Sequence, residues 1–324
     1  EVTIPEYSKD EPVTKRSILS HLRTIYDPLG IISPTLAEGK RIYRDACDEK
    51  KSWNTEVSPQ LACQWLRWSK QLRNIKVPRS IKRSVGKTKA IQLHMFADAS
   101  TLACCAVAIA VVETSTGVVK GLLASKSRIS KRDTSIPRLE LVSGHMAANM
   151  ARNVCNALHG WPIKSVTVWM DSLVALFWIN NPGKSWKVFV SNRVKKIAEI
   201  TNEVNITWKY CPKKLNLADL GGANIGKLEI QAWLTGPDWL LTEDEWPEQP
   251  ELKGSNETLD EQKATQPVFF CNEQERDEWD DLLDRSSYWR TLRVTAWMLR
   301  FVNNCRSKTK KVKSESGPLN TDEI

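Results

Sequence analysis

The spacing of apolar residues divides the chain into a helical N-terminal part and a central part that combines strands with helices. In the first part, apolar side chains recur every three or four residues, as in amphipathic helices. The turn Asp27-Pro28-Leu29-Gly30 separates the first helix from the second, because a residue before proline disfavours the helical conformation. The helices predicted in this part cover residues 14–26, 35–50 and 58–75.

From Ile91 the pattern changes to short apolar or alternating runs rich in Val, Ile and Ala, which predict strands. After Pro137 the apolar residues return at steps of three and four, and this long helix stops at Gly160. The other predicted elements are strands at 91–97, 103–112, 118–125, 165–170 and 205–210, and helices at 172–180, 187–202 and after Asp219. The order βββ-α-β-α-α-β-α predicts a mixed α/β layer fold.

The last third of the chain changes character twice, and charge marks both changes. Residues 229–284 hold 17 acidic and 3 basic side chains, which predicts an acidic linker. Residues 285–324 hold 9 basic and 3 acidic side chains, and their first twenty positions predict a basic amphipathic helix before a Lys-rich tail. We therefore expect four parts, namely 1–90, 91–228, 229–284 and 285–324.

Composition excludes several classes of protein. With 324 residues, 41% of them hydrophobic, the chain can bury a core and is not disordered throughout. It has no run of 18 apolar residues, so we expect no transmembrane helix and no membrane partner. Its eight cysteines form no Cys-x-x-Cys pair, which argues against structural zinc and is typical of reduced, intracellular proteins. Because the first residue is Glu1, we interpret the chain as a fragment of a longer polypeptide.

Positive charge is concentrated in the first 228 residues. They hold 35 Lys and Arg against 18 Asp and Glu, a net charge of +17. Such a body suits a polyanionic partner, because phosphate neutralisation and counterion release drive binding. A solvated basic surface without such a partner is the alternative on charge alone.

Four carboxylates of the central part lie at positions that apolar packing does not explain. They are Asp98 and Asp171 at strand ends, Glu140 in the first turn of the long helix, and Asp219 after the last strand. A single Asp at a strand end is commonly a helix cap, but four in this order of elements suggest a cluster at one sheet edge. We predict that Asp98, Glu140 and Asp171 converge there within a few ångströms.

Clustered carboxylates repel one another, and divalent cations relieve that repulsion. Two Mg²⁺ or Mn²⁺ ions about 4 Å apart can activate a water and stabilise the leaving oxygen of a phosphodiester. Hard oxygen ligands favour these cations over zinc.

The strings that contain these carboxylates resemble a known family. FADAS (96–100), IPRLEL (136–141), VWMDS (168–172) and NLADL (216–220) resemble the four ribonuclease H motifs of Pao/BEL-type retrotransposon polyproteins. Residues 14–34 resemble the stretch that follows the reverse-transcriptase palm in that family, and residues 285–301 resemble the helix leading towards its integrase.

The resemblance implies a ribonuclease H fold, with a five-stranded mixed sheet flanked by helices, over 91–228. It implies that Asp98, Glu140, Asp171 and Asp219 are catalytic and bind Mg²⁺ or Mn²⁺, and that the chain hydrolyses RNA in RNA–DNA hybrids. It implies a thumb- or connection-like segment at 1–90, and reverse-transcriptase and integrase parts of the same polyprotein as partners. The implied location is a cytoplasmic retrotransposon particle, with the nucleus as a further compartment.

Two strings depart from the family pattern. Tyr210-Cys211-Pro212 stands where the family has a His-Val-Pro-like string, and Leu220-Gly221-Gly222-Ala223-Asn224 stands where it has Leu-x-Ser-Arg-Gly. The second departure follows Asp219 directly and leaves the positioning of this residue open.

A basic segment with interleaved aromatic residues, 183–196, is a candidate for contact with nucleic acid, because cations can follow phosphates while a ring stacks on a base. The residues that we expect to bind nucleic acid are Lys184, Trp186, Lys187, Arg193, Lys195 and Lys196. In the alternative, the aromatic residues of this segment face the core and its lysines face water.

Two other functions remain as alternatives. The family segment has also carried the label of a Pao-type retrotransposon peptidase, but an aspartic peptidase needs Asp-Thr/Ser-Gly loops, and the chain contains none. A degenerate, non-catalytic scaffold that binds nucleic acid is the other alternative, in keeping with the altered string after Asp219.

Overall fold

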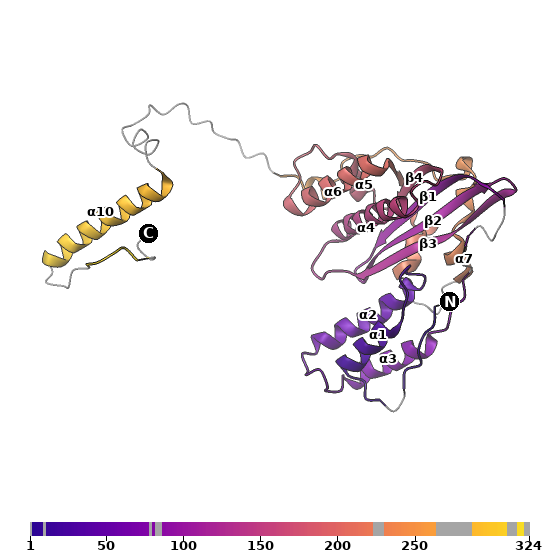
Figure 1. Ribbon diagram of the computed structural model, residues 1–324, viewed down its shortest axis with the longest axis horizontal. Coiled ribbons are helices and arrows are strands. Elements are labelled where there is room, and N and C mark those ends of the chain that lie inside the picture. Colours follow the sequence, from indigo (N-terminus) through magenta and orange to yellow (C-terminus); the bar gives the residue numbers. More distant parts are fainter. Residues whose placement is uncertain are drawn as a thin grey trace. The chain divides into compact units, whose positions relative to one another are not determined.

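The computed structural model describes residues 2–8, 11–77, 80–81, 86–222, 230–263, 287–309 and 316–320. The chain separates into two compact units, Glu1–Lys263 and Ala264–Ile324, which are described separately (Figure 1). Among the described residues, no helix has the length and apolarity that a membrane crossing requires.

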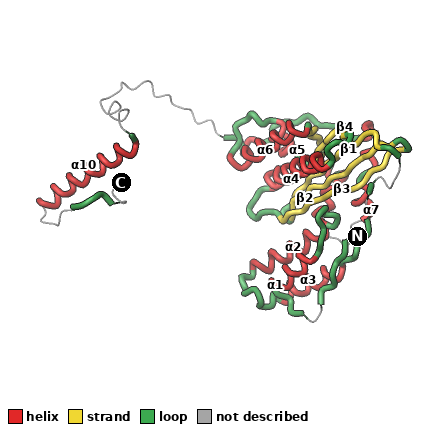
Figure 2. The backbone as a smooth tube through the Cα atoms, in the orientation of Figure 1, coloured by secondary structure: helices red, strands yellow, loops and turns green. Residues whose placement is uncertain are grey.

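A five-stranded sheet with the order β3-β2-β1-β4-β5 forms the centre of the first unit (Figure 2). The strands are β1 (Thr88–Ala99), β2 (Ala103–Thr114), β3 (Gly117–Ile129), β4 (Ile163–Met170) and β5 (Ile206–Tyr210). The first three form an antiparallel meander, whereas β4 pairs parallel to β1 and β5 pairs parallel to β4. This agrees with the α/β fold that the order of elements predicted and with the five-stranded mixed sheet that the resemblance implied.

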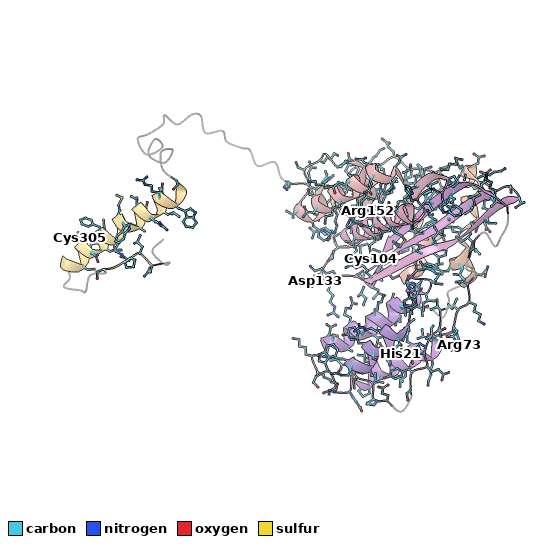
Figure 3. All side chains as sticks on the ribbon, viewed as in Figure 1. His21, Arg73, Cys104, Asp133, Arg152 and Cys305 are labelled. Atoms are coloured by element: carbon cyan, nitrogen blue, oxygen red, sulfur yellow. The ribbon has the colours of Figure 1, made fainter. Side chains whose placement is uncertain are left out.

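Strand β2 is apolar from Ala103 to Val112 because both of its faces are buried there. Cys104, which is labelled in Figure 3, lies with Ala106 and Ala108 in the core on one side of the sheet. The alternate residues Val107 and Ile109 lie in the core on the other side. Helices pack on both sides of the sheet, so the strand reads as a continuous apolar run rather than an alternating one.

Three helices cover the first side of the sheet: α4 (Ile136–Ala157), α5 (Leu173–Asn180) and α6 (Val188–Val204) (Figure 1). Helix α4 starts with Pro137 in its first turn, where the missing amide hydrogen of proline costs no hydrogen bond. Helix α6 ends at Asn205, whose left-handed backbone (φ 53°) closes the helix. Glu140 lies in α4 and therefore approaches the strand ends from this first side of the sheet.

The N-terminal helices α1 (Lys15–Thr24), α2 (Ser33–Asp48) and α3 (Pro59–Gln71) share their core with the second side of the sheet. The Ser33 hydroxyl lies 2.6 Å from the Ser125 hydroxyl of β3, and Arg44 donates to the Ser130 carbonyl at 2.9 Å. A Cβ at Gly30 would lie 1.9 Å from the Ser125 carbonyl oxygen, so only glycine permits this approach. The segment 1–90 therefore packs directly on the strand domain.

The stretch predicted as an acidic linker differs from that prediction in its described part, residues 230–263. It forms α7 (Ile230–Thr235), η4 (Asp238–Leu241), η5 (Glu243–Glu245) and α8 (Asn256–Leu259), and these short elements pack on the body. Trp233 is only 1% exposed, and its indole donates to the Ile31 carbonyl at 2.9 Å. Residues 264–286 lie outside the described part.

Acidic composition misled here because the charges and the apolar residues of this stretch occupy different sides. Asp244 and Glu245 face solvent, while Trp239 packs edge-on against Trp169 with ring centroids 5.0 Å apart. Lys120 of β3 pairs with Asp238 at 3.0 Å, which further ties the stretch to the sheet. A few buried aromatic residues are enough to dock a segment whose mean composition is that of a linker.

The second unit contains α10 (Tyr288–Thr309), in agreement with the helix predicted from the amphipathic pattern. Within this unit Arg300 is buried and donates to the Gly317 and Pro318 carbonyl oxygens at 2.7 and 3.2 Å.

His94 lies buried on the second side of the sheet and provides a pH-dependent contribution to stability. It is 0% exposed, accepts a hydrogen bond from the Trp169 indole at 3.2 Å, and contacts Trp246 edge-on. Burial, assisted by the charge of Lys209, lowers the pKa of His94 to about 4. The folded state therefore holds the neutral ring, while the unfolded state takes up a proton below the ordinary histidine pKa.

We expect His94 to contribute about 3 kcal/mol of pH-dependent stability, which is complete above about pH 6.5 and disappears as the pH falls to about 4. His94→Asn keeps an acceptor for Trp169 but cannot take up the proton. Urea unfolding of both proteins between pH 4 and 7 should show a free energy of unfolding that falls more steeply in the unaltered chain. Equal slopes would contradict a buried neutral His94.

Candidate active site

Three carboxylates meet at one edge of the sheet, and the parallel pairing of β1 and β4 explains why. Asp98 is the penultimate residue of β1, and Asp171 directly follows β4. Because parallel neighbours end at the same edge, these two side chains arrive together, and the first turns of α4 bring Glu140 to them. One oxygen from each of the three lies within 4.8 Å of the others. The convergence predicted from the sequence is present.

The cluster is buried and electrostatically strained. Burial, followed by the charges of Asp171 and Asp219, raises the pKa of Asp98 to about 7. Burial, followed by the charges of Asp98 and Asp171, raises the pKa of Glu140 to about 9. Burial also raises the pKa of Asp171. Such a group of carboxylates needs a proton or a cation to be stable at neutral pH.

The chemistry of the cluster fits a divalent cation. Within the described chain, Glu140 Oε2 and Asp171 Oδ1 are buried and have no hydrogen-bond partner. Unpaired buried carboxylate oxygens are costly, and together with Asp98 they form a set of hard oxygen ligands. Asp98, Glu140 and Asp171 are thus able to hold Mg²⁺ or Mn²⁺, and the group found among the described residues includes no Cys or His that would favour zinc.

Asp219 borders the cluster and is not one of its three close members. It lies in the short helical turn η2 (Leu217–Gly222), its side chain is half-exposed, and its Oδ1 is 3.8 Å from Lys213 Nζ. Its charge raises the pKa of Asp98, which places it near enough to act on the cluster. Of the altered string that follows it, Ala223 and Asn224 lie outside the described residues.

The loop that carries Asp219 is attached to the strand ends by Asn216, which opens the NLADL string but was not among the predicted site residues. Asn216 is buried, and its amide donates to the Ala97 carbonyl at 2.9 Å, one residue before Asp98. Its side-chain oxygen accepts from the Ala218 amide at 3.1 Å. Asn216 also lowers the pKa of Asp171 through a hydrogen bond, so it links the loop to the cluster.

The candidate nucleic-acid segment divides into exposed cations and a core residue. Exposed side chains are those of Lys184, Lys187, Lys195 and Lys196. Arg193 is half-buried and stacks on Phe189, with its guanidinium carbon 3.6 Å from the ring centroid. Trp186 differs from the expectation, because it is 2% exposed and its indole donates to the Asn181 carbonyl at 3.0 Å. Its ring packs in the core and cannot stack on a base.

The strand order and the placement of the acidic cluster define the class of this domain. A mixed β3-β2-β1-β4-β5 sheet flanked by helices, with carboxylates at the adjoining ends of β1 and β4, is a ribonuclease H-like α/β fold. The fold predicted from the sequence is confirmed.

Comparison with known families agrees with this class. Residues 14–172 match the family described as the Pao retrotransposon-like RNaseH-like domain. Residues 14–172 are thus similar to a Pao retrotransposon-like RNaseH-like domain, and the resemblance seen in the sequence motifs is confirmed as far as residue 172. No curated protein matches the chain.

Several solved structures of ribonucleases H are similar at low identity. RNase H1 from the halophilic archaeon Halobacterium salinarum NRC-1 is 11% identical, with a TM-score of 0.29 over 40% of this chain and 91% of that one. LC11-RNase H1, solved in complex with an RNA/DNA hybrid, is 20% identical, with a TM-score of 0.29 over 40% and 91%. The N-terminal RNase H domain of rv2228c from Mycobacterium tuberculosis is 15% identical, with a TM-score of 0.28 over 39% and 85%. The assignment of the fold rests on the strand order and the family match.

Proposed function

We propose that this chain is a metal-dependent endonuclease that hydrolyses the RNA strand of RNA–DNA hybrids. The observation that carries the proposal is the convergence of Asp98, Glu140 and Asp171 within 4.8 Å at the strand ends of a ribonuclease H-like fold. Packing of the core does not explain three buried carboxylates at one point, because their mutual repulsion lowers stability unless protons or a cation neutralise them. Carboxyl groups with shifted pKa values of this kind are typical of functional sites.

In this proposal the three carboxylates hold Mg²⁺ or Mn²⁺, which when bound supplies an activated water and charge stabilisation for phosphodiester hydrolysis. Asp98 and Asp171 lie on rigid strand ends, so they fix the position of the ligand set. Glu140 approaches from α4 and completes that set from a second element. Asp219, at the rim, is proposed as the fourth carboxylate of the site.

The surface beside the cluster is suited to phosphates. The charges of Lys196, Arg193, Arg152 and Arg128 act with burial to lower the pKa of His145, so these cations lie around one point between α4 and its neighbours. Arg152 on α4 is labelled in Figure 3. We propose this surface, together with the exposed lysines of 184–196, as the contact for the hybrid backbone, with Lys184, Lys187, Arg193, Lys195 and Lys196 as its residues.

The direct test is cleavage of an RNA–DNA hybrid that is labelled on its RNA strand, with Mg²⁺, with Mn²⁺ and with EDTA. We expect cleavage with either cation and none with EDTA, and no cleavage of the matching DNA duplex. Tight hybrid binding without cleavage under all three conditions would favour a non-catalytic scaffold. Proteolysis that is inhibited by pepstatin and insensitive to EDTA would favour the peptidase.

Substitution of two exposed lysines tests the binding surface. We expect Lys187→Ala with Lys196→Ala to weaken hybrid binding about 10-fold at 0.1 M salt and to flatten the dependence of log affinity on log salt by about 1 to 2, because fewer phosphates are neutralised. Lys164 is exposed at the start of β4, at the opposite end of this strand from Asp171. Lys164→Ala should therefore bind as the unaltered chain does, and an equal loss in both proteins would argue against a localised surface.

We also propose, from the sequence resemblance, that 1–90 is the segment next to a reverse transcriptase and that 285–324 leads towards an integrase of the same polyprotein. A cytoplasmic particle, with access to the nucleus, is the location that follows from that arrangement.

A further inference from the structure

One lysine faces the acidic cluster from the loop after β5. Lys213 begins the turn η1 (Lys213–Leu215), and its Nζ lies 3.8 Å from Asp219 Oδ1, with a side chain that is 72% exposed. Its charge also lowers the pKa of Asp98, Glu140 and Asp171. A single ammonium group thus acts on all four carboxylates of the candidate site.

The backbone that carries Lys213 is attached to both strands that supply the carboxylates. The Cys211 amide donates to the Met170 carbonyl at 2.8 Å, directly before Asp171. On the other side, the Asn216 side chain donates to the Ala97 carbonyl at 2.9 Å, directly before Asp98. Between these two attachments, the Leu215 amide donates to the Pro212 carbonyl at 2.8 Å. The backbone of Lys213 is therefore held in place, while its side chain extends into solvent.

The neighbouring Lys214 provides a contrast within the same turn. It is exposed, and together with Lys213 and Asp219 it lines a cleft of about 240 Å³. It has no ion pair among the described residues, and it does not contribute to the pKa shifts of Asp98, Glu140 or Asp171. Two adjacent lysines thus share a loop and its solvent exposure, but only Lys213 is directed at the carboxylates.

We propose that Lys213 is a positioning residue that balances the charge of the carboxylate cluster and competes with divalent cations for it, so that it sets the cation affinity of the site. The inference rests on the proposed function, since it concerns the same carboxylates. When a divalent cation binds, the ammonium group leaves Asp219.

The expected effect is moderate because Lys213 is exposed. A unit charge about 4 Å from a carboxylate contributes about 1 kcal/mol under full solvent screening, and more when water is partly excluded. Removal of this competing charge should therefore tighten the binding of a divalent cation about 5- to 10-fold at low salt. The difference should shrink at high salt, because salt screens exposed charges.

The experiment measures Mn²⁺ binding by the full chain without nucleic acid, from the electron paramagnetic resonance signal of free Mn²⁺. The proteins are the unaltered chain, Lys213→Met, Lys213→Arg and the matched control Lys214→Met, with Asp98→Asn as the reference for a damaged site. We expect about 5- to 10-fold tighter binding for Lys213→Met only. Lys213→Arg and Lys214→Met should bind as the unaltered chain does, and thermal unfolding should show that all variants are folded.

The outcomes separate this inference from the proposed function. Equal Mn²⁺ affinity in Lys213→Met and the unaltered chain overturns the role of Lys213, even if the hybrid is cleaved. Equal tightening in Lys213→Met and Lys214→Met also overturns it, because the effect would then be one of net charge. Failure to cleave any hybrid, with the affinity shift present and specific to Lys213→Met, rejects the nuclease function and leaves the charge competition standing.

Discussion

Asp98→Asn is expected to abolish hybrid cleavage and, at the same time, to stabilise the protein in the absence of metal. The amide has the shape of the carboxylate but is a poor cation ligand, so we expect a loss of cleavage of about 10³-fold or more. In the metal-free protein the same change removes a carboxylate whose charged form is disfavoured by burial and by its acidic neighbours. Activity and stability should therefore move in opposite directions.

The stability gain should depend on pH in a defined direction. The pKa of Asp98 is raised to about 7 in the folded state. A carboxylate with a raised pKa supports folding fully below its unfolded value of about 4, and that support is lost as the pH rises through about 7. In EDTA, Asp98→Asn should exceed the unaltered chain by about 1–3 kcal/mol in free energy of unfolding at pH 8, and by little at pH 4.

Asp133→Asn is a matched control for both measurements. Asp133 is an exposed carboxylate with a left-handed backbone (φ 57°), a conformation that Asn also tolerates. This variant should cleave and unfold as the unaltered chain does. If Asp98→Asn cleaves the hybrid at the normal rate, Asp98 does not bind a catalytic cation. If its stability in EDTA is unchanged at pH 8, the carboxylates do not repel one another as proposed.

Periodicity predicted the secondary structure because local sequence and burial agree along most of this chain. The long helix was recognisable since its apolar residues face one sheet, and α4 (Ile136–Ala157) begins two residues before the predicted start after Pro137. Strand β1 begins at Thr88, three residues before the predicted start. Its first residues are not buried, so the apolar pattern did not mark them as part of the strand. The strand order itself needed tertiary information or a family resemblance.

The candidate site was partly predictable for a similar reason. Asp98 and Asp171 end buried strands and interrupt apolar runs, so they stand out in the sequence. Lys213 does not, because a lysine in a polar loop is ordinary there, and Asn216 belongs to the NLADL string without being predicted as a site residue. Their importance depends on hydrogen bonds to Met170 and Ala97, which lie far away in the sequence.

Trp186 and the stretch 230–263 were misjudged because the burial of an aromatic residue in a polar sequence is decided by its partner. Trp186 lies among lysines, yet it forms an isolated β-bridge with Gln262. The stretch that covers it looks like a linker by charge. The ring of Trp186 contacts Phe177 and Trp178, while Trp233 of the stretch bonds to Ile31. These tertiary contacts are not visible in the local sequence.

Trp233→Ala is expected to cost about 3–5 kcal/mol of stability, because it leaves a cavity the size of an indole. Trp233 is 1% exposed and belongs to the core shared by the N-terminal helices and the second side of the sheet. The substitution also leaves the Ile31 carbonyl without its indole donor. Urea unfolding followed by circular dichroism measures the loss, and Trp233→Phe should cost less because it keeps most of the ring volume.

The matched control is Trp161→Ala, since Trp161 is about half exposed in a turn before β4. That variant should lie within about 0.5 kcal/mol of the unaltered chain, as is usual for surface substitutions. A large loss confined to Trp233→Ala means that 230–263 is an integral part of the folded body. Its acidic side chains are then held at the surface and are not free to fold over the basic face that we propose for the hybrid. If Trp233→Ala and Trp161→Ala unfold alike, the stretch contributes nothing to the body, and its acidic charge remains available to compete with phosphates for that face.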